Sequence, residues 1–342
     1  MIRWLICTLL ATGLASCSRP PPAEGPPAQR AFYYWRTTFA LSATEQRAIS
    51  EARVSRLYVR MFDITAEGEL AGKITLGAGA HVPAGVEVVP VVFVRQDVFR
   101  HEGTAATTAL ARRTWDEVAH RLALLGVTAH ELQVDCDWTD TSREPFFAFV
   151  AALRTAAPGL ALGATIRLHQ IKYRERTGVP PVDRGMLMFY NMGTFSAEAG
   201  TKAIFDADRA ARYVDRIASY PLPLDVALPI WSWTVHTRDG EVVDLLQSTD
   251  PDELPAIDFL RAVGPDRWIA TRTAFLHGSL LREGDVLKVE VTTPADALAA
   301  ARLVASHLAA APGRTISLFD LSERNLHRHG PDAIQELFRA LR

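Results

Sequence analysis

Short apolar runs alternate with longer amphipathic segments along the chain from Phe32 onward. The short runs have the length and the β-branched or aromatic content of strands. They predict strands over 32–38, 56–63, 86–95, 131–138, 161–169, 184–191, 224–231 and 315–320. The longer segments predict helices over 42–52, 104–125, 143–157, 206–219, 294–311 and 331–341.

Signals at the helix starts agree with this division. Ser42 and Glu45 have the spacing of a capping box, and Pro294 and Pro331 suit first-turn positions. Eight strands with helices in most connections, over roughly 310 residues, favour one α/β domain rather than two. We therefore predict a (β/α)8 TIM barrel over 31–342.

The segment 232–293 interrupts the alternation after the seventh strand. It contains a hairpin signal, Arg-Asp-Gly at 238–240, and an apolar stretch over 285–293 that is typical of a strand. We interpret this segment as an insertion at the mouth of the barrel.

The first residues have the layout of an export signal. Arg3 precedes an uncharged apolar run over 4–15, which is shorter than the roughly 20 residues needed to span a bilayer. The tetrapeptide Leu-Ala-Ser-Cys at 14–17 resembles the bacterial lipobox, in which the Cys sulfur receives a lipid. The resemblance implies cleavage before Cys17, lipidation of Cys17 and a signal over 1–17.

The Pro-rich stretch 18–30 then predicts an extended tether. Ser18 resembles the residue that follows the Cys in lipoproteins sorted to the outer membrane. We expect a protein of the cell envelope, and Ser18 favours the outer membrane over the inner membrane as its location. Its folded part would lie outside the cytoplasm, and the lipid would be its membrane contact.

Composition restricts the classes of partner and cofactor that the protein can bind. With 48% hydrophobic and 22% charged residues, the chain can bury a large core. A formal charge of −2, with both signs interspersed, provides no basic stripe for nucleic acid. Beyond Cys7 and Cys17, Cys136 stands alone, and no His, Asp or Glu cluster has firm ligand spacing. We expect no metal and no other cofactor.

Alternation along the strands points to a polar mouth. In the strand over 131–138, Asp135 and Asp137 share the face opposite to the apolar residues, and Arg167 and His169 do so over 161–169. The same argument places further polar residues inward near strand ends: Arg36, Arg60, Arg95 and Tyr190. Barrel enzymes carry their sites at these ends. The alternative is a layer of ion pairs that satisfy one another.

Two of these strands resemble a known family. The sequence Leu-Gln-Val-Asp-Cys-Asp-Trp at 132–138 resembles the fourth-strand signature of family 18 glycoside hydrolases, which are chitinase-like. The stretch 186–191 resembles their sixth strand, which ends in a Tyr that contacts substrate. The resemblance implies a carbohydrate ligand, with Asp135, Asp137 and Tyr190 in the catalytic centre.

The family's catalytic Glu falls on Thr139, which cannot protonate a glycosidic oxygen. Hydrolysis would then need a proton from His169, Asp140 or Asp320. Neighbouring arginines are expected to lower the pKa of the two strand aspartates. We include His169 among the catalytic candidates.

A second resemblance covers more of the chain. The stretches 33–39, 57–63, 135–139, 165–170 and 185–193 resemble a group of uncharacterised bacterial lipoproteins. This resemblance implies the same barrel and the same export, and it leaves the chemistry open.

Several residues near strand ends are candidates for ligand binding. The aromatic ones are either platforms for sugar rings or packing residues: Trp138, Trp231 and Trp233. Trp35 has outward parity and is expected in the core. The arginines Arg36, Arg60, Arg95 and Arg167 can clamp a carboxylate or phosphate, which would favour an acidic glycan. Asn191 and Asp320 complete the predicted ligand site.

Two functions follow as hypotheses. The first is a glycoside hydrolase-like enzyme that acts on a polysaccharide of the envelope or the environment. The second is a lectin-like barrel that binds carbohydrate without catalysis, which Thr139 favours.

Overall fold

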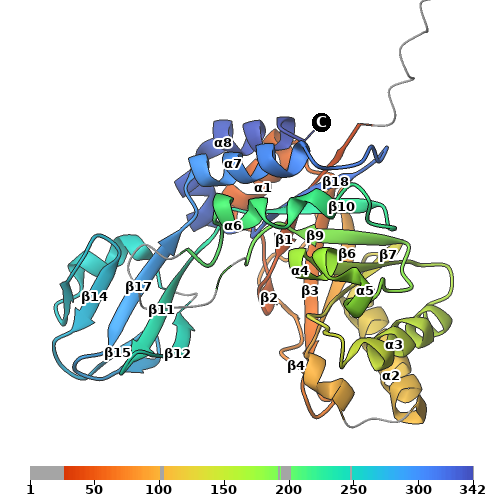
Figure 1. Ribbon diagram of the computed structural model, residues 1–342, viewed down its shortest axis with the longest axis horizontal. Helices are drawn as coiled ribbons and strands as arrows, with labels where there is room; N and C mark the ends of the chain where they lie inside the picture. The colour runs from red at the N-terminus through yellow and green to blue at the C-terminus, as the bar shows by residue number, and fades with distance from the viewer. Residues whose placement is uncertain (1–26, 101–103, 192, 194–201, 247–248, 342) are drawn as a thin grey trace, which may run out of the picture.

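The computed structural model describes residues 27–100, 104–191, 193, 202–246 and 249–341. Within these residues, eight parallel strands close into a barrel (Figure 1). The strands are β1 (Gln29–Tyr34), β3 (Arg56–Ile64), β6 (Glu87–Val94), β7 (Glu131–Asp135), β8 (Ala161–Arg167), β9 (Arg184–Met188), β10 (Leu224–Pro229) and β18 (Thr315–Phe319). β1 pairs with both β18 and β3, so the sheet has no open edge at this point. The predicted (β/α)8 TIM barrel is confirmed.

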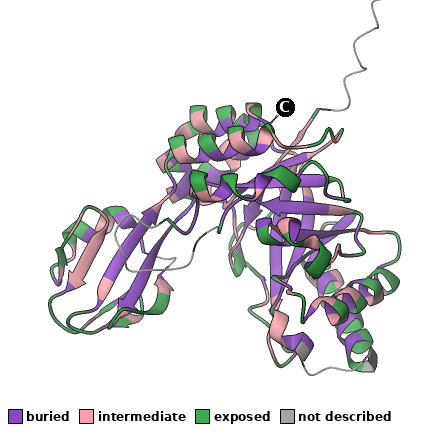
Figure 2. Ribbon diagram, in the orientation of Figure 1, coloured by how far each residue is buried: buried purple, intermediate pink, exposed green. Residues whose placement is uncertain are grey.

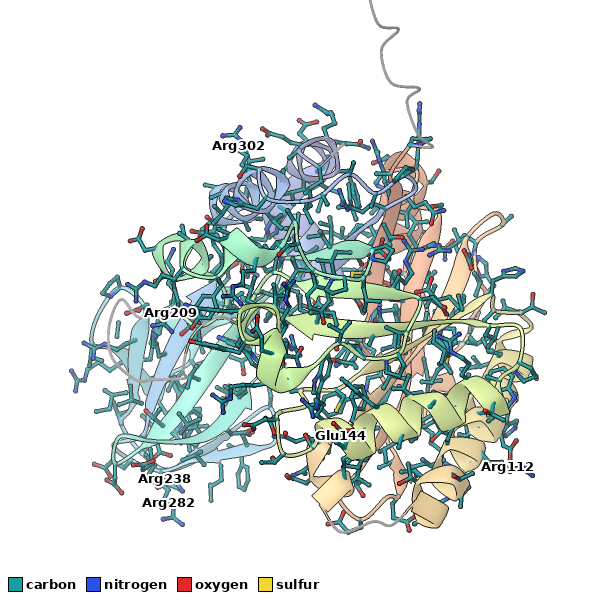
Figure 3. All side chains as sticks on the ribbon, turned by 45° about the vertical axis from the view of Figure 1, so that its right-hand side comes forward. Arg112, Glu144, Arg209, Arg238, Arg282 and Arg302 are labelled. Carbon is teal, nitrogen blue, oxygen red and sulfur yellow. The ribbon has the colours of Figure 1, made fainter. Side chains whose placement is uncertain are left out.

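Helices cover the outside of the barrel, with their buried faces toward the strands (Figure 2). They are α1 (Ala43–Glu51), α2 (Thr104–Leu125), α3 (Arg143–Ala156), α4 (Leu168–Lys172), α5 (Arg174–Thr177), α6 (Ala207–Ala211), α7 (Pro294–Ala305) and α8 (Glu323–Arg339). Short 3-10 helices lie at η1 (Gln96–Arg100), η2 (Val214–Arg216) and η3 (Pro251–Ala256). Charged side chains such as Arg112, Glu144 and Arg302 point away from the body of the protein (Figure 3). None of the helices in the described ranges is long and apolar enough to cross a membrane.

Local signals explain most helix boundaries. Ser42 and Glu45 form the predicted capping box at the start of α1. The helix predicted over 206–219 is wrong, because α6 ends at Ala211 and only η2 follows. At this point Lys172 Nζ donates to the Arg212 carbonyl at 3.1 Å. This tertiary hydrogen bond therefore uses a carbonyl that would accept an intrahelical hydrogen bond if the helix continued. α8 begins earlier than predicted, and its two halves meet at Gly330, whose φ is 73°.

The segment after β10 forms a separate lobe beside the barrel (Figure 1). Its antiparallel sheet contains β11 (Ser232–Arg238), β12 (Glu241–Leu246), β13 (Leu260–Ala262), β14 (Arg267–Ala270) and β17 (Val286–Val291). A small hairpin, β15 (Ala274–Leu276) with β16 (Ser279–Leu281), adjoins it. The lobe has its own apolar core, which includes Leu254, Leu281 and Leu287. We call this lobe the insertion. Minor strands β2 (Thr38–Phe39), β4 (Leu70–Ala71) and β5 (Thr75–Leu76) lie in the loops after β1 and β3.

Ion pairs fill the end of the barrel at which the strands begin. Arg56 Nη1 lies 3.0 Å from Glu131 Oε2, and Arg184 Nε lies 2.6 Å from Asp225 Oδ2. Asp225 Oδ1 also accepts a hydrogen bond from the Thr315 backbone at 2.6 Å. A mutually paired charged layer therefore exists in this barrel, and it lies at the end opposite to the predicted site.

This layer predicts a large stability effect at Asp225. Asp225→Ala should lower the free energy of unfolding by about 3 kcal/mol, because removing one partner of a buried ion pair leaves the other charge without compensation. Arg184 is a quarter exposed, which places the loss at the lower end of the usual range for such pairs. Urea unfolding measures the effect. The exposed Asp258, paired with Arg272, is the matched control, and Asp258→Ala should leave stability nearly unchanged. Equal losses in both variants would contradict this role of Asp225.

Candidate functional site

Two adjoining cavities open at the end of the barrel where the strands finish. The inner cavity measures about 490 Å³, and its walls include Trp35, Asp135, Trp231, Phe319 and Asp320. The outer cavity measures about 460 Å³, and its walls include Gln96, Asp137, Thr139, His169 and Tyr213. Both share three residues, Arg167, Tyr190 and Asn191. We call the two cavities together the mouth groove.

Arg167 holds the two strand aspartates together at the centre of this groove. It is the last residue of β8, and its Nε donates to Asp137 Oδ1 at 2.5 Å. Its Nη2 lies 3.7 Å from Asp135 Oδ1. Thr165 Oγ1, two residues earlier on the same strand face, donates to Asp135 Oδ1 at 2.7 Å. One guanidinium therefore contacts both carboxylates, as strand parity predicts.

Burial raises the pKa of Asp135. Desolvation raises the pKa of this carboxyl above its ordinary value, and the charge of Asp137 raises it further. The Arg167 guanidinium and the Thr165 hydrogen bond act in the opposite direction. The lowered pKa that the sequence predicts is wrong for Asp135, because desolvation outweighs the neighbouring cation.

Asp320 brings a second carboxyl to the inner cavity, directly after β18. Its Oδ1 accepts a hydrogen bond from Asn325 Nδ2 at 2.6 Å. Burial raises the pKa of Asp320 to about 6, and the positive charges of Arg324 and Arg36 oppose this shift. A substantial fraction of Asp320 is thus protonated in mildly acidic solution, so it can donate a proton.

Aromatic side chains form one wall of the inner cavity. Tyr190 and Trp231 meet edge to face with ring centroids 4.6 Å apart, and Trp231 lies 5.1 Å from Phe319. Trp233 continues this wall, 6.0 Å from Trp231. Burial raises the pKa of Tyr190 well above its ordinary value, so its hydroxyl stays protonated, and it donates to Met188 Sδ at 3.3 Å.

Of the two other candidates for a proton donor, His169 lies in the groove and Asp140 does not. His169 lines the outer cavity, and partial burial lowers its pKa. Asp140 is not among the residues that line the groove, and it accepts a hydrogen bond from Arg176 Nη2 at 2.7 Å. That bond lowers the pKa of Asp140, which removes it as a source of protons. Thr139 also lines the outer cavity.

Trp138 is a packing residue, and its prediction as a ligand platform is wrong. Its side chain is 0% exposed, and its Nε1 donates to the Thr177 carbonyl at 2.8 Å. The ring stacks on Phe146 of α3 with centroids 5.0 Å apart. β7 ends at Asp135, three residues before the predicted end, so strand parity no longer applies at Trp138.

Two predicted arginines lie outside the groove. Arg60 Nε donates to Asp63 at 2.8 Å and its Nη1 donates to the Gly72 carbonyl at 2.9 Å. A bulge in β3 between Arg60 and Phe62 shifts the register at this point. Arg95 follows β6, is exposed and pairs with Asp97, so it clamps no ligand from the groove wall.

Trp35 lies in the cavity wall against prediction, whereas Arg36 lies there as predicted. Trp35, expected in the core, lines the inner cavity, because it follows Tyr33, whose hydroxyl points inward to Gln133. Arg36 also lines this cavity, yet its Nη2 pairs with the buried Glu45 at 2.7 Å. Sequence reasoning also missed Phe93, Phe319 and Arg324 in this wall. The inward parity of Tyr33 was the available signal for Trp35.

No group of three or more His, Cys, Asp or Glu residues in the described ranges is arranged to hold a metal ion. Cys17 and the predicted signal lie outside the described residues.

No protein-family model matches this chain. No curated protein sequence is significantly similar to it. Its fold is similar to that of a putative chitinase A from Streptomyces coelicolor, at 14% identity over 92% of this chain and 99% of that chain, with a TM-score of 0.49. It is also similar to the spore cortex-lytic enzyme SleL from Bacillus cereus, at 10% identity over 93% and 75% of the two chains, with a TM-score of 0.48. Human YKL-39, described as a pseudo-chitinase with retained chitooligosaccharide binding, is similar at 9% identity over 92% and 99%, with a TM-score of 0.47.

The raised pKa of Asp320 predicts a pH dependence of stability. An unfolded Asp has a pKa of about 3.9, and the folded value is about 6. Between these values the folded state binds a proton that the unfolded state lacks. Stability is therefore lost as pH rises through this window, by up to about 3 kcal/mol.

Asp320→Asn should remove this loss, so that the variant gains stability relative to wild type at pH 7.5 but not at pH 4. Urea unfolding at both pH values measures the difference. Asp258→Asn, which changes an exposed aspartate, is the control. A pH dependence that is unchanged in Asp320→Asn would contradict a raised pKa of Asp320.

Proposed function

We propose that this protein is a lipid-anchored glycoside hydrolase of the cell envelope that binds a polysaccharide in its mouth groove. The inner cavity combines an aromatic wall with two carboxyl groups and three arginines. Aromatic rings with a polar edge are suited to sugars, which present both an apolar face and hydroxyl groups. Arg167 and Asn191 supply polar contacts along the same path.

The observation that carries the proposal is the presence of Asp135 and Asp320 in one cavity with different surroundings. Cleavage of a glycosidic bond uses one carboxylic acid as proton donor and one carboxylate that stabilises positive charge on the sugar. Asp320, with a pKa of about 6 and an amide as its neighbour, suits the donor. Asp135 suits the charged partner, because the Arg167 guanidinium and the Thr165 hydroxyl favour its charged form against the burial that raises its pKa. Asp320 thus fills the role that Thr139 cannot.

The topology supports the proposed anchoring. β1 enters the barrel at Gln29, at the end where strands begin, whereas the groove lies where strands finish. A chain tethered through Cys17 would therefore present its groove on the side away from the point of attachment. Such a placement suits a polymer outside the anchoring membrane.

The first test targets the proton donor. Asp320→Asn should reduce sugar release by about 100-fold or more, the usual contribution of a general acid, while glycan binding is retained. Wild-type hydrolysis should decline above pH 6 as Asp320 loses its proton. Reducing-end assays on a panel of purified envelope and environmental polysaccharides, with parallel pull-down binding, measure both quantities. Asp258→Asn is the control, and full activity of Asp320→Asn would refute this assignment.

A lectin-like function is the second candidate, and Thr139 in the wall of the outer cavity favours it. The wild-type protein would then bind a glycan in the same assay and release no sugar from it at any pH. Retained binding without turnover would replace the hydrolase proposal with this one.

Anchoring has its own test. Cys17→Ala should abolish incorporation of a labelled fatty acid and move the protein out of the membrane fraction of a bacterial host. Cys136→Ala is the matched control, because that thiol is buried in the barrel and should leave labelling intact. Labelled Cys17→Ala protein in the membrane fraction would show that the anchor lies elsewhere.

A further inference from the structure

A cavity of about 590 Å³ lies at the junction of the insertion and the loops of the barrel. We call it the seam cavity. Trp268 of β14, Phe205 and Pro251 provide apolar surface in its wall, and Asp266 and Thr292 provide polar groups. Its size lies within the range of about 300–1,000 Å³ that is usual for small-ligand sites.

Two polar atoms in this wall have no hydrogen-bond partner among the described residues. Thr292 is 2% exposed, and its Oγ1 accepts and donates nothing there. Asp266 Oδ1 is buried and unpartnered in the same way. Buried polar atoms in native proteins are almost always paired, so two orphans in one cavity wall point to a ligand that supplies hydrogen-bond donors.

The charges around the seam cavity restrict that ligand. Glu290 Oε1 accepts from Lys288 Nζ at 2.9 Å, so its charge is compensated. Asp296 is likewise paired, with Lys202 at 2.9 Å. Asp252 lies 3.6 Å from Arg328. Asp266 forms no ion pair with another described residue, which leaves an excess of negative charge and disfavours an anionic ligand.

We propose that the seam cavity is a second carbohydrate site, which binds a sugar unit through hydroxyl or ammonium donors. The sugar ring packs against the Trp268 indole, and its donors reach Asp266 and Thr292. Neutral sugars and amino sugars meet these requirements, whereas uronic acids do not. The site does not depend on whether the mouth groove cleaves its ligand.

The seam cavity and the mouth groove are linked through one hydrogen bond. Trp233 lines the inner cavity, and its Nε1 donates to Glu290 Oε2 at 3.2 Å. Glu290 lines the seam cavity. A polymer held by a sugar in the seam cavity is therefore kept beside the groove, which raises its local concentration there.

Isothermal titration of the full-length protein tests the proposal with three probes: N-acetylchitotetraose, which is neutral, a chitosan tetramer, which carries ammonium groups, and tetragalacturonate, which is acidic. The wild type should show two classes of site for the neutral or the amino tetramer. Trp268→Ala and Asp266→Asn should each weaken one class by at least about tenfold, the other being unchanged. If Asp266→Asn weakens binding of the chitosan tetramer alone, the ligand's donor to Asp266 is an ammonium group. If it weakens binding of both the chitosan tetramer and N-acetylchitotetraose, the donor is a hydroxyl group.

Phe275→Ala is the matched control, because this aromatic residue lies in the same insertion and is 69% exposed. It should retain both classes. Asp266→Asn keeps the size of the side chain, so it tests the site even if Trp268→Ala fails to fold. Wild-type affinity for every class in Asp266→Asn, or Asp266-dependent binding of tetragalacturonate, would overturn the proposal. Failure of the hydrolase proposal is distinguishable, because it removes sugar release and leaves this second class of binding.

Discussion

The pairing of charges at the two ends of a closed barrel governs the rest of this structure. At the end where strands begin, Arg184 and Asp225 are paired within the barrel wall. At the other end Arg167 contacts Asp135 and Asp137, and its Nη1 has no hydrogen-bond partner among the described residues. A buried charge requires partners. The first arrangement pairs opposite charges within the barrel, whereas the second places the unpartnered Arg167 Nη1 in the wall of the groove.

Burial also separates the carboxyl groups of the groove by role. Asp137 is 53% exposed and forms the tightest contact with Arg167, so it holds that guanidinium in place. Asp320 lies in the wall of the inner cavity beside Phe319, and its carboxyl accepts a hydrogen bond from the neutral amide of Asn325. The environment of each carboxyl, more than its distance along the chain from another, determines which one can carry a proton. A sequence motif centred on one strand does not contain that information.

The alternation of short apolar runs with amphipathic segments predicts the fold, and strand parity predicts part of the site. Asp135 and Arg167 were predicted correctly as inward residues because β7 and β8 are regular up to those positions. Arg60 lies outside the groove, because Asp63 and the Gly72 carbonyl hold its guanidinium. Trp138 lies outside it because β7 ends at Asp135. The raised pKa of Asp320 depends on burial by residues distant in sequence, which no local pattern records. The seam cavity likewise requires the long-range pairing of β14 with β17.

The insertion is joined to the barrel through a neck in which its entering and leaving strands pair. Ser232 of β11 is opposite Val291 of β17, and the Thr292 backbone donates to the Trp231 carbonyl at 3.2 Å. Trp231, Trp233 and Glu290 all lie in or beside this neck. The neck therefore contributes residues to both walls: Trp231, Ser232 and Trp233 to the inner cavity, and Glu290, Val291 and Thr292 to the seam cavity.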